Sequence, residues 1–146
     1  MQTSRGSTLK GVVTISLMAV NVVFWVPILL VVALAKLLIP LAAWRRWTSA
    51  LMIWIAQAWI SCNGAIFSLM GALQLEVDGV EGLDPRSWYL VLSNHQSWVD
   101  ILVLQKAFNR RIPFLKFFLK QELIWVPFLG LAWWALDFPF MKRHSA

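Results

Sequence analysis

The sequence from Gly11 to Ala35 reads GVVTISLMAVNVVFWVPILLVVALA and contains no charged residue. A helix of about 20 apolar residues is enough to cross the roughly 30 Å hydrocarbon layer of a bilayer. This stretch is therefore long enough to form a membrane helix. Asn21 is its main polar residue, and we expect Pro27 to kink the helix because proline removes a backbone hydrogen bond.

The same stretch has some features of a secretory signal peptide. Arg5 and Lys10 give it a basic start, and Ala33-Leu34-Ala35 has the small-x-small pattern of a cleavage site. The apolar part of a signal peptide is typically only about 7–15 residues long. Because the run from Gly11 to Ala35 is longer, we favour a membrane helix that stays in the protein.

A second uncharged stretch extends from Trp47 to Leu75 and could also cross the membrane or lie at its surface. Gly64 and Ser68 are four residues apart, a spacing that allows close contact between helices. The same spacing also occurs on helices that face only lipid. The sequence leaves both interpretations open.

The residues between the two stretches are basic and aromatic. Trp44-Arg45-Arg46-Trp47 is typical of a turn at the level of the lipid headgroups. Two spanning helices would place Lys36, Arg45 and Arg46 outside, against the tendency of basic loops to stay in the cytoplasm. A pair of helices that enter one leaflet, with all loops cytoplasmic, avoids this conflict. We favour this re-entrant or monotopic anchor over two spans.

The composition agrees with a membrane protein. Of 146 residues, 60% are hydrophobic and 14% are charged, and ten are Trp. One cysteine, Cys62, and two histidines exclude a disulfide scaffold and a closed zinc site. Nothing in the sequence suggests a bound metal or prosthetic group, and we expect neither. The net charge of +6 suits anionic lipid headgroups, and we expect no nucleic-acid partner.

The character of the chain changes after Leu75, because four acidic residues follow within nine positions. We therefore predict a membrane anchor over residues 1–75 and a second domain over residues 76–146. Short β-prone and helical stretches alternate in the second domain, which predicts an α/β fold with helices packed on a partly parallel sheet. The predicted strands are 73–78, 88–92, 112–115 and 138–141, the helices are 97–108, 118–125 and 129–136, and a turn is expected at 84–87.

The segment Asn94-His95-Gln96-Ser97-Trp98-Val99-Asp100 lies where a predicted strand meets a predicted helix. Open α/β sheets place their functional sites at such junctions. His95 can accept a proton near neutral pH, and Asp100 could fold back to orient its imidazole. Alternatively, Ser97 caps the helix and Asp100 interacts with the helix dipole, which would leave His95 as a turn residue.

This segment resembles the first signature of the glycerolipid acyltransferases, the lysophosphatidic acid acyltransferase family, which reads Asn-His-x-x-x-x-Asp. The resemblance continues through Phe118–Leu123 and Val126–Gly130, which are similar to a Lys-x-x-Leu and a Pro-x-x-Gly segment of the family. Phe140–Arg143 is similar to the hydrophobic stretch ending in Arg that follows. The likeness covers roughly residues 74–143.

The resemblance implies an acyltransferase of phospholipid biosynthesis. His95 would take a proton from a glycerol hydroxyl of lysophosphatidic acid or a related lysophospholipid, and Asp100 would orient His95. The acyl donor would be acyl-coenzyme A or acyl-carrier protein, with no covalent acyl-enzyme. Asn94 could hold the turn or the oxyanion, whereas Ser97 is expected to be a helix cap rather than a nucleophile. Lys120 is the candidate for contact with the phosphate-bearing acceptor.

Two further expectations concern the location of the site and the role of three tryptophans. Because the donors are cytosolic, the site should lie on the cytoplasmic side of the membrane. We expect a membrane of the bacterial inner-membrane type or another membrane that borders the cytoplasm. Trp125, Trp133 and Trp134 should pack in the core or at the interface, or form the wall of an acyl-chain groove.

The family's second signature, Glu-Gly-Thr/Ser-Arg, does not occur downstream of His95. We therefore expect either a piece of a longer acyltransferase or a protein of reduced function, in which the 146 residues alone are inactive and poorly stable. The alternative function is a non-catalytic, truncated membrane-anchored protein that binds lipid or a partner.

Overall fold

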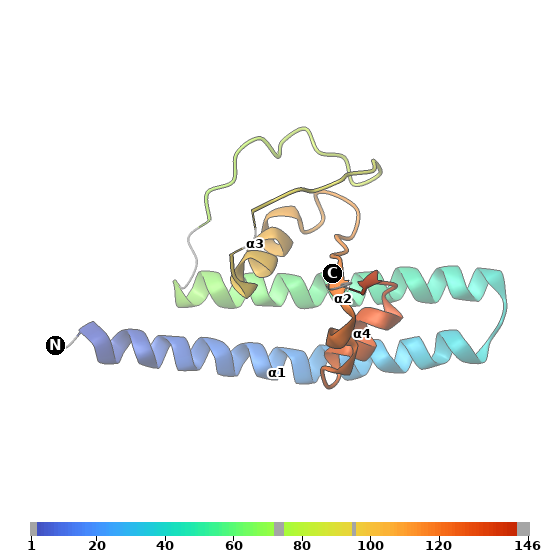
Figure 1. The fold of residues 1–146 in the computed structure, drawn as a ribbon, viewed down its shortest axis with the longest axis horizontal. Coiled ribbons are helices and arrows are strands. Elements are labelled where there is room, and N and C mark those ends of the chain that lie inside the picture. The colour runs from blue at the N-terminus through green and yellow to red at the C-terminus, as the bar shows by residue number, and fades with distance from the viewer. Residues whose placement is uncertain (1–2, 72–74, 95, 143–146) are drawn as a thin grey trace. The chain divides into compact units, whose positions relative to one another are not determined.

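A computed structural model describes residues 3–71, 75–94 and 96–142, with side chains from residue 7 onward. The chain begins with two long helices, α1 (Thr3–Leu38) and α2 (Ala42–Met70), and the shorter helix α3 (Trp98–Phe108) follows. The remaining elements are short, as Figure 1 shows. They are β1 (Leu119–Lys120), the 3-10 helix η1 (Gln121–Trp125), α4 (Leu129–Ala135) and β2 (Phe140–Met141).

The two predicted apolar helices are confirmed. Residues Ser7–Leu38 of α1 and Ala42–Met70 of α2 are both long and apolar enough to cross a membrane. α1 continues through Pro27 as one helix. Several apolar side chains of α1 are more than half exposed, as expected where lipid rather than protein covers a helix; they include Ile15, Val20, Val23 and Val31. These features indicate a membrane protein, and whether its helices span the bilayer stays a prediction.

The prediction of a turn at Trp44-Arg45-Arg46-Trp47 is wrong, because these residues lie in the first turns of α2. The chain reverses earlier, at residues 39–41. Pro40 explains the position, since proline disfavours a helical conformation in the residue before it. The Trp44 indole still lies at the helix connection, because its Nε1 donates to the carbonyl oxygen of Ala35 at 2.9 Å.

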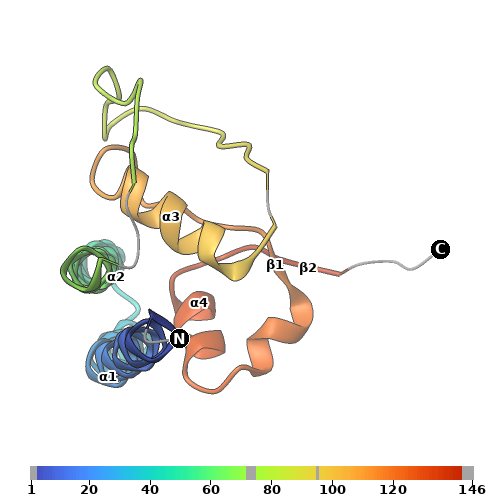
Figure 2. The ribbon, with the colours of Figure 1, turned by 90° about the vertical axis from the view of Figure 1, so that its left-hand side faces the viewer.

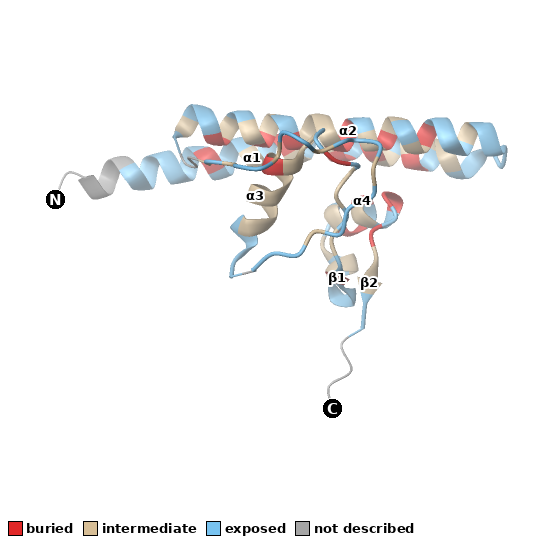
Figure 3. Cartoon of the chain, turned by 90° about the horizontal axis from the view of Figure 1, so that it is seen from above, coloured by how far each residue is buried: buried red, intermediate tan, exposed pale blue. Residues whose placement is uncertain are grey.

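The chain forms two compact units, residues 1–22 with 57–115, and residues 23–56 with 116–146. In the first unit, buried amides join α1 to α2. Asn21 Nδ2 donates to Asn63 Oδ1 at 2.8 Å and to the carbonyl oxygen of Trp59 at 3.2 Å. Buried residues occur at intervals along α1 and α2, and many of the remaining residues of these helices are exposed (Figure 3).

The segment between α2 and α3 contains the predicted turn but no described strand. The turn at Asp84–Ser87 is confirmed by a hydrogen bond of 3.0 Å from Ser87 N to Asp84 O, with Asp84 Oδ1 accepting from Arg86 N. The strands predicted at 73–78 and 88–92, and the strand predicted after α3 at 112–115, are wrong, because residues 75–78, 88–92 and 112–115 are irregular; residues 73–74 lie outside the described part. A strand exists only where a second strand pairs with it, and propensity alone does not supply that partner.

The second unit contains the sheet. β1 and β2 pair in parallel, with Leu119 opposite Phe140 and Lys120 opposite Met141. A parallel pair of strands is therefore confirmed, although β2 is shorter than the predicted 138–141. The predicted helix at 118–125 is partly wrong, since Leu119–Lys120 form β1 and only Gln121–Trp125 are helical, as the 3-10 helix η1. The helix predicted at 129–136 is confirmed as α4. The architecture is a mixed helix and strand fold.

Candidate active site

The motif that resembles an acyltransferase signature lies at the start of α3. Ser97 is the N-cap residue, in an extended conformation, and its Oγ accepts a hydrogen bond of 3.3 Å from the backbone N–H of Val99. Asp100, three residues later, completes a capping box. The predicted capping role of Ser97 is thus confirmed, and its hydroxyl is already engaged by the helix.

The carboxylate of Asp100 binds the backbone that precedes α3. Its Oδ2 accepts from Gln96 N at 2.6 Å and from Ser97 N at 2.7 Å. Two amides that converge on one oxygen fix the position of this carboxylate, which also lies at the positive end of the helix dipole. The chain from Gln96 to Asp100 is therefore folded into one tight turn.

His95 lies outside the described residues. Asn94 precedes it and is exposed, in the irregular segment before α3. The structure thus brings Gln96, Ser97 and Asp100 together at the position that the sequence predicted for the site. The catalytic roles of His95 and Asp100, and substrate binding by Asn94, stay predictions.

The other end of α3 makes contacts that the sequence analysis missed. Lys106 Nζ donates to Ser68 Oγ at 3.0 Å, and Asn109 Nδ2 donates to Ser61 Oγ at 2.8 Å. The spacing of Gly64 and Ser68 contained a signal, but it fits lipid exposure as well as close helix contact, and the structure shows the contact. The element that contacts this face of α2 is α3.

A small hollow lies beside these contacts, with a volume of about 10 Å³. That is room for about one water molecule, so the hollow is not a groove for an acyl chain. The buried Oδ1 of Asn109 has no hydrogen-bond partner among the described residues. The lining residues come from α2, from the C-terminal end of α3 and from the segment after α3, and they include Gln57, Ile60, Gln105, Phe108, Asn109 and Ile112.

The second unit contains the other part of the acyltransferase-like sequence. Lys120 is exposed at the end of β1, directly before η1. Gly130 is buried in α4, and a Cβ at this position would overlap the backbone carbonyl of Ile124. Phe128, at the start of α4, has a φ of 62°. The Pro-x-x-Gly segment is thus a sharp turn in which only glycine leaves room for the preceding helical turn.

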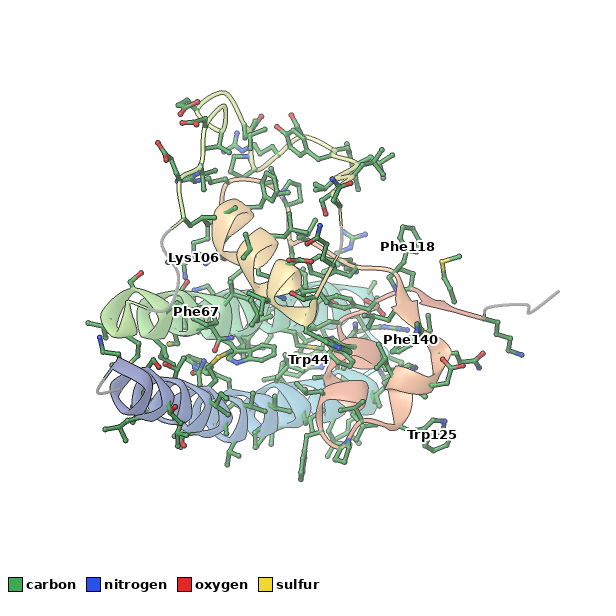
Figure 4. All side chains as sticks on the ribbon, turned by 60° about the vertical axis from the view of Figure 1, so that its left-hand side comes forward. Trp44, Phe67, Lys106, Phe118, Trp125 and Phe140 are labelled. Carbon is green, nitrogen blue, oxygen red and sulfur yellow. The ribbon has the colours of Figure 1, made fainter. Side chains whose placement is uncertain are left out.

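The tryptophans of this unit do not form a core. Trp125 is 84% exposed and Trp134 is 52% exposed, whereas Trp133 is partly buried. In Figure 4 the Trp125 ring points away from its ribbon. The prediction that Trp125 and Trp134 pack in the protein core is therefore wrong. A role at the membrane interface or in an acyl-chain groove stays a prediction.

Residues 74–146, half of the chain, match the Acyltransferase family. The chain belongs to the Acyltransferase family. The match includes the whole Asn94–Asp100 motif, Lys120 and the Pro-x-x-Gly turn. The predicted resemblance is confirmed by this match.

The relatives of this chain are also acyltransferases by name. The 1-acyl-sn-glycerol-3-phosphate acyltransferases alpha of Mus musculus and Homo sapiens are each 35% identical to it over 72 residues. That of Ovis aries is 33% identical over the same length. Each match covers 49% of this chain and 24% of the relative, so the chain spans about a quarter of the length of these proteins. No solved structure matches the chain.

Proposed function

We propose that the protein transfers a fatty acyl group from an acyl thioester to the free glycerol hydroxyl of lysophosphatidic acid or a related lysophospholipid. The observation that carries this proposal is the family match over residues 74–146, which includes the Asn94–Asp100 motif at the start of a helix. The names of the relatives support the acceptor, since each is a 1-acyl-sn-glycerol-3-phosphate acyltransferase. The donor is acyl-coenzyme A or acyl-carrier protein.

In the proposed reaction, His95 removes the proton from the glycerol hydroxyl as its oxygen attacks the thioester carbonyl. The tetrahedral intermediate then collapses, the carbon–sulfur bond breaks, and the thiolate takes the proton from the imidazolium of His95. The products are the ester and the free thiol. Because the thioester is already activated, a base is the main requirement of the reaction, and we propose no metal or prosthetic group.

The role proposed for Asp100 is to orient His95 and to stabilise its protonated form. Support comes from the backbone of Gln96, which follows His95 directly in the chain and donates to Asp100 Oδ2. A side chain held in this way is a fixed partner for a neighbouring imidazole. Capping and catalysis are therefore compatible functions of one carboxylate.

Asn94 and Lys120 are proposed substrate-binding residues. Asn94 is the exposed first residue of the motif, where an amide can donate to the oxyanion or hold the turn. Lys120 is an exposed cation of the kind that binds a phosphate. The acceptor lies among membrane lipids, whereas the acyl donors are cytosolic. We therefore propose that the site lies at the cytoplasmic surface of the bilayer, where both substrates can reach it.

The test is acyl transfer from radiolabelled acyl-coenzyme A to lysophosphatidic acid, with the full-length protein in lipid vesicles. We expect His95→Ala to abolish transfer while the protein is recovered in the membrane at its normal level. Asp84→Ala is the matched control, because Asp84 caps a surface turn outside the motif. Near-normal turnover by His95→Ala would refute the role of His95 as the base.

A further inference from the structure

α3 is attached to α2 by its C-terminal end. The two hydrogen bonds run from Lys106 to Ser68 and from Asn109 to Ser61, with donor–acceptor distances of 3.0 and 2.8 Å. Gly64 lies between the two serines, on the same side of α2, because residues three and four positions apart share one helix face. We call these five residues the α2–α3 joint.

The size of residue 64 controls how closely α3 can approach. A Cβ at Gly64 would lie 3.6 Å from Cγ of Lys106, which is an ordinary van der Waals contact. Alanine therefore fits, whereas a longer side chain would need the space of the Lys106 stem. In Figure 4 Lys106 is labelled where α3 approaches α2.

The motif lies at the opposite end of the same helix. In Figure 2 the C-terminal end of α3 lies beside α2, and its N-terminal end is directed away from it. Trp98 and Val99, in the first turn, are 64% and 50% exposed. An 11-residue helix is about 16 Å long, so a tilt of about 5° at the joint moves the far end by more than about 1 Å. Displacements of this size can cost about a hundredfold in rate.

On the basis of the proposed acyl transfer, we propose that the α2–α3 joint sets the height of the Asn94–Asp100 motif relative to the lipid leaflet. Lys106 and Asn109 are then positioning residues, which act on the reaction through α3. An acceptor embedded in the membrane has its hydroxyl at a fixed depth, and the base must reach that depth. An acceptor dissolved in water has no such restriction, so the joint matters only for the embedded acceptor.

The experiment compares Gly64→Leu with the matched control Gly64→Ala on two acceptors. One acceptor is long-chain lysophosphatidic acid in phosphatidylcholine vesicles, and the other is a short-chain lysophosphatidic acid dissolved as monomers. We expect Gly64→Leu to lower kcat/KM by about tenfold or more for the embedded acceptor. Transfer to the dissolved acceptor should change less than about twofold, and Gly64→Ala should leave both unchanged within the same limit.

A second pair of variants tests the hydrogen bond itself. Ser68→Ala removes the acceptor of Lys106 and should lower transfer to the embedded acceptor selectively, whereas Ser68→Thr keeps a hydroxyl and should restore it. An equal loss with both acceptors would mean that the joint only supports folding. No loss with either acceptor would show that the joint does not position the motif. Either result overturns the proposal.

A spin label tests the joint separately from catalysis. Val99→Cys in a Cys62→Ala background carries the label at the motif end of α3, and its accessibility to oxygen and to a water-soluble nickel chelate reports its depth in vesicles. We expect the same depth with Gly64 and Gly64→Ala and a changed depth with Gly64→Leu. An unchanged depth overturns the joint proposal. Absence of transfer by the unmodified protein to both acceptors would instead overturn the proposed function.

Discussion

At the scale of single residues, Asp100 has two tasks that one substitution can separate. Asparagine keeps an oxygen that accepts from Gln96 N and Ser97 N, but it has no negative charge to stabilise an imidazolium. We expect Asp100→Asn to leave the helicity of α3 unchanged and to lower acyl transfer by about 10³–10⁴-fold. Circular dichroism and the vesicle assay measure the two effects. An equally large loss in the control Asp84→Asn would contradict the assignment.

Ser97 provides the complementary test at the same helix end. Removing its hydroxyl deprives Val99 N of an acceptor and should cost about 1 kcal/mol of stability, as for other N-cap residues. Because the proposed reaction has no acyl-enzyme, Ser97→Ala should retain transfer within about tenfold of the unmodified protein, and Ser97→Thr should restore stability. Complete loss of transfer in a folded Ser97→Ala protein would identify a nucleophile instead.

Gly130 is a residue where backbone geometry alone forbids a side chain. A Cβ there overlaps the backbone of Ile124, which cannot move away as a flexible side chain can. We expect Gly130→Ala to destabilise the protein by about 1–3 kcal/mol in thermal unfolding in detergent. Gly82→Ala is the control, because nothing lies within 4 Å of a Cβ at Gly82. Equal stability of the two variants would contradict the close approach of α4 to η1.

At the scale of elements, the buried amides of Asn21 and Asn63 link α1 to α2. Asn21 Nδ2 and Asn63 Oδ1 are 2.8 Å apart, and both side chains are buried. Hydrogen bonds between membrane helices are worth about 0.6 kcal/mol on average and up to about 1.7 kcal/mol. A double-mutant cycle with Asn21→Ala and Asn63→Ala should therefore give a coupling of about 0.5–1.7 kcal/mol.

The control for this cycle pairs Asn63→Ala with Thr14→Ala. Thr14 Oγ1 bonds to Lys10 O within α1, so it does not contact α2 through this bond. The two effects should add within about 0.5 kcal/mol. Equal coupling in both cycles would show that the Asn21–Asn63 bond does not hold the helices together.

The elements also show what the sequence could and could not predict. The two long apolar stretches, the Asp84–Ser87 turn and the start of α3 depend on local signals, namely hydrophobic length, an Asp-Pro pair and a capping serine, and these predictions are confirmed. The stretch 88–92 has strand propensity, but pairing depends on a distant partner, so it is irregular. The pairing of β1 with β2 and the contact of α3 with α2 are also non-local. The sequence shows the residues of each of these elements, but it does not show which distant element each one contacts.

At the scale of the whole molecule, the basic residues around the helix connection favour an anchor in one leaflet. If Lys36, Arg45 and Arg46 stay on the cytoplasmic side, the connection lies on the side that we propose for the acyltransferase segment. In a Cys62→Ala background, we expect Leu41→Cys and Arg86→Cys to react with an impermeant maleimide from the cytoplasmic side only. Both positions are exposed, which makes them a matched pair.

The two labelling sites distinguish three arrangements. Reaction of Leu41→Cys from the outside, with Arg86→Cys still cytoplasmic, would show two spanning helices and contradict the one-leaflet anchor. Reaction of Arg86→Cys from the outside would remove the proposed access of both acyl donors to the site. Cytoplasmic reaction of both residues supports the proposed location.

The central claim is that the motif at the start of α3 catalyses acyl transfer to a lysophospholipid, with His95 as the base. The most direct measurement is the rate of labelled acyl transfer from acyl-coenzyme A or acyl-carrier protein to lysophosphatidic acid, for the full-length protein and for His95→Ala in the same vesicles. We predict transfer by the unmodified protein and none above background by the variant. Equal rates in the two proteins, or no transfer by either with both donors, would contradict the claim.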